Sequence, residues 1–98
     1  MINKIDKFLP LGSVVILKDA VKRLMIVGYC ARIEADDNAP YYDYVGCLYP
    51  EGIFTSEQSI VFNHDDVDKI LYQGLYDEEA KKFESKLKVV ANKLKGKE

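Results

Sequence analysis

The chain has 98 residues, of which 48% are hydrophobic and 31% are charged, and its net charge is −2. This length predicts a single domain spanning residues 1–98, and the composition excludes the apolar-poor, highly charged class of disordered proteins. The slightly acidic balance argues against a nucleic-acid-binding protein, which needs a basic face to neutralise phosphates.

The start of the chain carries charges at every second or third position, and no apolar segment follows them. A signal peptide is therefore not expected, because its central region is apolar. The longest apolar runs, at residues 14–17 and 24–27, are far shorter than the roughly 20 residues of a membrane-spanning helix. We expect a protein that is not inserted in a membrane and stays in the cytoplasm.

A β-hairpin is predicted near the start of the chain. The β-branched apolar runs at residues 14–17 and 24–27 are joined by a polar connector of hairpin length at 18–23. The second strand is expected to continue to residue 33, with Gly28 marking a bulge or a sharp bend.

Turn residues and further apolar runs divide the segment that follows. Pro50 suits the second position of a type I turn. Asn63 is a good cap for a short helix, with Asp66 in the place of a capping box. The predicted order is a loop at 34–40, a tyrosine-rich strand at 41–48, a turn at 49–52, and strands at 59–62 and 70–75.

A C-terminal amphipathic helix is predicted at residues 77–95, because acids at its start and lysines at its end match the helix dipole. We expect its apolar stripe to pack on the sheet, the alternative being that it pairs with a helix of another chain, such as a second copy in a homodimer. The stripe consists of Ala80, Phe83, Leu87, Val90 and Leu94.

The predicted fold class is α+β. It consists of a small five-stranded bent antiparallel sheet or SH3-like barrel with one short helix, followed by the C-terminal helix. The β-rich body spans residues 9–76 and the helix spans residues 77–95.

The residues capable of metal or redox chemistry are few. Cys30 and Cys47 lack the close partners of structural zinc sites, so we expect them to be reduced and buried. His64 stands among aspartates, but the glycine and distant glutamate of a calcium loop are missing. No phosphate loop or nucleophile elbow is present either. We therefore expect no metal, no cofactor and no enzymatic activity.

Four tyrosines lie in a stretch of nine residues, 41–49, which covers the third predicted strand and the start of the turn after it. Tyrosine is enriched at protein–protein interfaces, where a rigid apolar ring with a polar tip contributes strongly to binding. Burial in the core is the competing interpretation, because side chains alternate between the two faces of a strand. We predict a partner-binding site formed by Tyr42, Tyr44, Tyr49 and Glu51.

Several segments also follow an order that resembles a known family. They are LPLGSVVILK at 9–18, LMIVG at 24–28, YDYVGCLYPEG at 42–52 and FNHDDVD at 62–68. With them the chain resembles domain-of-unknown-function family 4176, small Firmicutes proteins whose genes often lie in type VII secretion clusters beside LXG-domain toxins. The resemblance covers about residues 9–79.

The resemblance implies a function but no catalytic residues. It implies a cytoplasmic accessory protein, an adaptor or chaperone that binds a secreted toxin or another small secretion factor. Two alternatives remain open: an immunity protein that neutralises a toxin, and a small-barrel nucleic-acid-binding protein.

Overall fold

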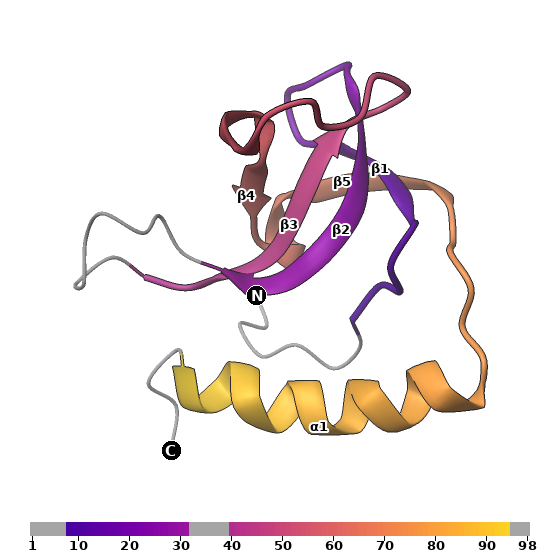
Figure 1. The fold of residues 1–98 in the computed structure, drawn as a ribbon, viewed down its shortest axis with the longest axis vertical. Coiled ribbons are helices and arrows are strands. Elements are labelled where there is room, and N and C mark those ends of the chain that lie inside the picture. The colour runs from indigo at the N-terminus through magenta and orange to yellow at the C-terminus, as the bar shows by residue number, and fades with distance from the viewer. Residues whose placement is uncertain (1–7, 32–39, 95–98) are drawn as a thin grey trace.

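The chain forms one five-stranded antiparallel sheet and one long C-terminal helix (Figure 1). The structure is a computed structural model, and it describes residues 8–31 and 40–94. The predicted α+β class is confirmed. The elements are β1 (Val14–Leu17), β2 (Arg23–Ala31), β3 (Tyr42–Leu48), the 3₁₀ turn η1 (Ser56–Gln58), β4 (Ile60–Phe62), the 3₁₀ turn η2 (His64–Asp66), β5 (Val67–Tyr72) and α1 (Glu78–Leu94).

The sheet is open. Its strand order is β4-β3-β2-β1-β5, so β4 and β5 are its two edges, and the barrel alternative is wrong. The predicted irregularity at Gly28 is confirmed, because the β2–β3 register shifts between Ile26 and Gly28. Gly46 on β3 has a packing reason: a Cβ there would lie 2.9 Å from the ring of Phe62 and 3.0 Å from the carbonyl oxygen of Met25.

Two local predictions need correction. The turn after β3 closes over five residues, since the Gly52 N–H donates to the Leu48 carbonyl at 2.8 Å, and it contains a cis Tyr49–Pro50 peptide bond, so it is not the predicted type I turn. The last strand starts at Val67 rather than residue 70, because the preceding helix is a single 3₁₀ turn. The predicted loop up to residue 39 and the extension of β2 to residue 33 lie outside the described residues.

The hydrophobic core lies between one face of the sheet and α1. The ring of Tyr44 stands near its centre, with ring centroids 5.4 Å from Phe62 and 5.7 Å from Phe8. Cys47 is buried and Cys30 half-buried, and no disulfide joins them. The core residues are Phe8, Leu9, Val15, Leu24, Ile26, Tyr44, Phe62, Leu87 and Ala91.

The buried side of α1 differs from the predicted stripe. The helix turns Glu84, Leu87 and Ala91 inward, whereas Phe83 is 53% and Val90 46% exposed. At 3.6 residues per turn, the buried side is rotated by about 50° from the centre of the predicted stripe. The apolar pattern could not show this rotation, because a charged residue, Glu84, occupies the buried side. Among the residues that the structure describes, no helix is long and apolar enough to cross a membrane.

Candidate functional site

The two segments richest in polar motif residues, 42–52 and 62–68, are joined by hydrogen bonds. The His64 N–H donates to Asp43 Oδ2 at 2.8 Å, and the Asp43 N–H donates to Asn63 Oδ1 at 3.1 Å. Asp66 Oδ2 accepts from the Asn63 N–H at 2.9 Å, as a capping box requires. These bonds tie β3 to the start of η2.

Tyr44 belongs to the core. Its side chain is 0% exposed, and burial raises its pKa well above the usual value of a tyrosine. Its hydroxyl oxygen accepts from the Leu9 N–H at 3.0 Å and lies 2.7 Å from His64 Nδ1. The prediction of Tyr44 as a partner contact is therefore wrong, because the side chain is already enclosed by the protein itself.

A cluster of buried hydrogen bonds holds the segment Phe8–Leu9 against α1. Glu84 Oε2 accepts from the Phe8 N–H at 2.7 Å, and the Tyr76 hydroxyl donates to the other oxygen of this carboxylate. The same hydrogen bond raises the pKa of Tyr76. The Tyr29 hydroxyl donates to the Leu9 carbonyl at 2.7 Å, and burial raises the pKa of Tyr29 to about 12. These hydrogen bonds, like those between β3 and η2, stabilise the fold.

The face of the sheet turned away from α1 is open and carries aromatic side chains. Arg23 and Met25 alternate along β2 with the core residues Leu24 and Ile26, so they point to this other face. A shallow pocket of about 380 Å³ lies there. We call its exposed or half-exposed large residues the tyrosine face: Arg23, Met25, Tyr49, Leu71 and Tyr72.

The register of β5 explains why two consecutive residues line this pocket. Val14 pairs with Tyr72 but Val15 pairs with Ile70, so Leu71 is an extra residue in the ladder. Such a bulge can redirect a side chain. Leu71 and Tyr72 are 50% and 64% exposed, and both border the pocket.

Polar contacts hold the rim of the tyrosine face. The Arg23 guanidinium lies 5.2 Å from the ring centroid of Tyr49, a distance suited to a cation–π contact. Next to it, the Lys22 ammonium donates to the Glu51 carboxylate at 2.8 Å and lowers the pKa of that carboxyl.

The predicted site is not one surface. Tyr49 and Glu51 are exposed, whereas Tyr42 is half-buried and shares the face of the core residue Tyr44. From Tyr42 to the end of β3 at Leu48 the strand rises by about 20 Å. Tyr49 and Glu51 thus remain candidates at the tyrosine face, and Tyr42 lies apart from them.

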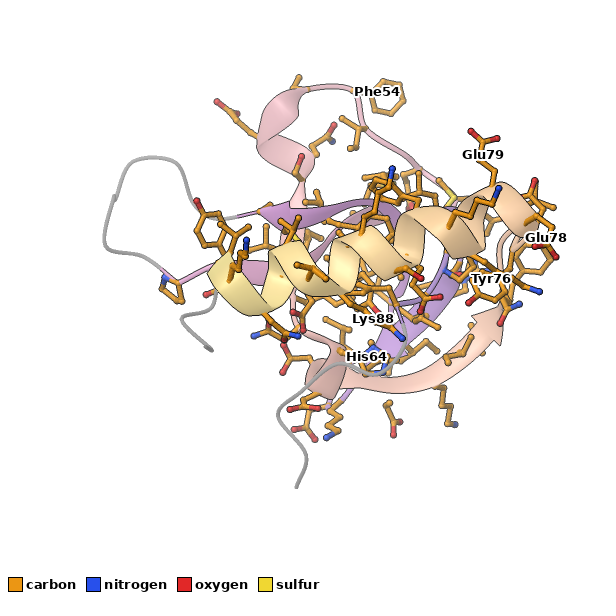
Figure 2. All side chains as sticks on the ribbon, turned by 90° about the horizontal axis from the view of Figure 1, so that it is seen from below. Phe54, His64, Tyr76, Glu78, Glu79 and Lys88 are labelled. Atoms are coloured by element: carbon orange, nitrogen blue, oxygen red, sulfur yellow. The ribbon has the colours of Figure 1, made fainter. Side chains whose placement is uncertain are left out.

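Sequence reasoning missed part of the tyrosine face and one exposed ring. Residues 71 and 72 were expected in a strand, but only the cross-strand register shows which face they share with Tyr49. Phe54 is 82% exposed, and Figure 2 shows it at the outer end of its loop. Gln58 Oε1 fixes that loop by accepting from the N–H groups of Phe54 at 2.5 Å and Thr55 at 2.9 Å.

Within residues 8–31 and 40–94, no group of three or more His, Cys, Asp or Glu side chains is placed to hold a metal ion. His64 lies against Tyr44 instead, with ring centroids 5.9 Å apart.

Comparison with known proteins gives one match. A search of the curated proteins found no match, and neither did a search of the solved structures. A family model described as a domain of unknown function, DUF4176, matches residues 8–83. The match starts at the core residue Phe8, covers the whole sheet and ends in the second turn of α1. The chain therefore belongs to the DUF4176 family.

Proposed function

We propose that this protein is a non-enzymatic, cytoplasmic accessory protein that binds another protein through the tyrosine face. Following the resemblance described above, the proposed partner is an LXG-type toxin of a type VII secretion system, for which the chain serves as adaptor or chaperone. The observation that supports protein binding is the open pocket bordered by half-exposed Tyr49, Leu71 and Tyr72.

The composition of the tyrosine face suits an interface core. Tyrosine, methionine and arginine are enriched in such cores, whereas lysine and the acids are depleted. The five residues of the tyrosine face are of the favoured or neutral kinds, and the ion pair of Lys22 and Glu51 supplies a polar rim beside them. Rim charges of this kind contribute to specificity and association rate more than to affinity.

Part of the tyrosine face is held by the fold. The Arg23 guanidinium lies over the Tyr49 ring, and the backbone of Tyr72 pairs with Val14 of β1. A backbone that is already fixed loses less conformational entropy on binding, so more of the contact free energy appears as affinity.

The test is binding of the purified chain to the separate domains of an LXG toxin. An adaptor binds the N-terminal targeting domain, and we expect Tyr72→Ala and Tyr49→Ala to weaken that binding by more than about 1 kcal/mol each. Both side chains are partly exposed, so the melting temperature should change little. Tyr42→Ala is the matched control, because it removes the same ring from the other face.

Two results would contradict the proposal. Binding to the C-terminal toxin domain alone would identify an immunity protein instead. Binding that is lost with Tyr42→Ala but kept with both tyrosine-face variants would place the partner on the other side of the sheet.

A further inference from the structure

One side of α1 carries apolar residues that the described part of the chain leaves about half exposed. Phe83, Val90 and Leu94 are 53%, 46% and 38% exposed. Their spacing of seven and four places them on one flank of the helix, beside the buried side centred on Leu87. We call these three residues the exposed helix row. They extend over about 16 Å, or three helical turns.

The exposed helix row leads into a groove. A hollow of about 420 Å³ lies between the first half of α1 and the segments before β1 and after β5. Leu11 and Leu75 stand at its walls and are 52% and 77% exposed, and Phe83 is shared by the groove and the row. Exposed apolar side chains therefore follow one another from Leu75 in the groove, through Phe83, to Leu94 at the end of α1.

The outer border of the exposed helix row is basic. Lys82, Lys86 and Lys93 follow one another along α1, all exposed, on the side of the row that faces solvent. We call them the lysine edge. Among residues 78–94 of α1, Glu79 is the only acid on this border; Figure 2 shows it on the side of the helix opposite Lys88.

We propose that the groove and the exposed helix row bind an amphipathic helix of a partner protein, a helix whose apolar side is bordered by acidic residues. The apolar side of such a helix fills the groove and covers the row, as helix-in-groove partners do. Its acids lie opposite the lysine edge, where unlike charges favour association and fix the orientation. This inference rests on the proposed function only in that both assume a protein partner; the surface is a different one.

Two other occupants fit the charges and the shape less well. A second copy of the chain would bring its own lysine edge against this one, and like charges across an interface are unfavourable. This disfavours the homodimer through α1 that the sequence left open as an alternative. A flat membrane surface cannot reach the bottom of a groove walled by Leu11 and Leu75.

The test is titration of the full chain with two synthetic amphipathic helical peptides. Both carry the same leucine row, bordered by glutamates in one and by lysines in the other. We expect the glutamate-bordered peptide to bind at least about tenfold more tightly, with a preference that declines as salt is added. Lys86→Glu should reduce the preference, because it lowers the charge of the lysine edge from +3 to +1.

Neighbouring valines provide a matched pair of variants. Val90→Asp places a charge in the exposed helix row and should weaken binding about tenfold or more. Val89→Asp introduces the same charge at a residue that is 56% exposed and about 100° away around the helix, beside Lys86 and Lys93, so it should weaken binding clearly less than Val90→Asp does. Leu94→Asp repeats the test if Val90→Asp disturbs folding. Tyr72→Ala should have no effect, because the tyrosine face is elsewhere.

Any of four results would overturn the inference. They are equal binding of both peptides or of neither, equal effects of the two valine substitutions, self-association of the chain that Val90→Asp removes, and binding to phosphatidylglycerol vesicles that Val90→Asp removes. Loss of peptide binding alone leaves toxin binding through the tyrosine face intact, so the two proposals fail separately.

Discussion

Replacement of Tyr44 by phenylalanine isolates the role of one buried hydroxyl. The ring stays, so its contacts with Phe62 and Phe8 are kept, while the oxygen that accepts from the Leu9 N–H at 3.0 Å is lost. Leu9 is only 6% exposed, so water cannot readily replace the lost acceptor. The contact with His64 Nδ1 is lost too, but His64 is partly exposed and can turn to water.

The expected cost follows from these two contacts. A buried N–H left without an acceptor costs about 1–3 kcal/mol, and an ordinary hydrogen bond contributes about 1 kcal/mol. Because water compensates His64, only the first contribution remains, and we expect Tyr44→Phe to lower the free energy of unfolding by about 1–3 kcal/mol. For a domain of this size, that corresponds to a melting temperature lower by about 5–20 °C.

Thermal and urea unfolding followed by circular dichroism measure this change. Tyr42→Phe is the control on the same strand, and it should change stability by less than about 1 kcal/mol. A fall in melting temperature below about 3 °C for Tyr44→Phe would show that the Leu9 N–H finds another acceptor. The hydroxyl would then have no structural role.

Three further variants test the packing and its pH dependence. Leu87→Asp should cost about 3 kcal/mol because Leu87 is buried, whereas Phe83→Asp should cost only about 1 kcal/mol because Phe83 is half exposed. Similar melting temperatures of the two variants would contradict the observed rotation of α1. Gly46→Ala should cost about 1–3 kcal/mol in urea unfolding, because its methyl group meets the Phe62 ring, and unchanged stability would show that the ring can move aside. The pKa of Tyr29, raised to about 12, means that the unfolded state loses this proton first, so stability should fall as pH rises from about 10 to 12. Tyr29→Phe should make that fall shallower in urea titrations, and an unchanged slope would contradict the role of Tyr29.

The strands and the helix could be predicted because local chemistry determines them. The β-branched run at 14–17 can hardly form anything but a strand, and the acids and lysines of α1 mark its two ends. The bulge at Gly28 and the cap provided by Asp66 follow from single residues whose backbone or side chain has a known preference.

The candidate site could not be predicted to the same extent, because it depends on contacts distant in sequence. Hydrophobicity alone excludes Glu84 from a buried surface, yet the Phe8 N–H and the Tyr76 hydroxyl make its burial favourable and so set the rotation of α1. Alternation showed that Tyr42 and Tyr44 share a face, but not that this face is the core. The bulge that turns Leu71 toward the pocket depends on pairing with β1.

The hydrogen bond between the Phe8 N–H and Glu84 has a consequence for folding during synthesis. The two residues are 76 positions apart, and Leu87 and Ala91 complete the same core still later in the chain. When a ribosome-bound chain has exposed only the sheet, α1 has not yet emerged, and the core around Phe8 and Leu9 is still incomplete. Contacts this distant in sequence form slowly, because a long loop must close before they contribute. The domain should reach its native state only after residue 91 has left the ribosomal tunnel.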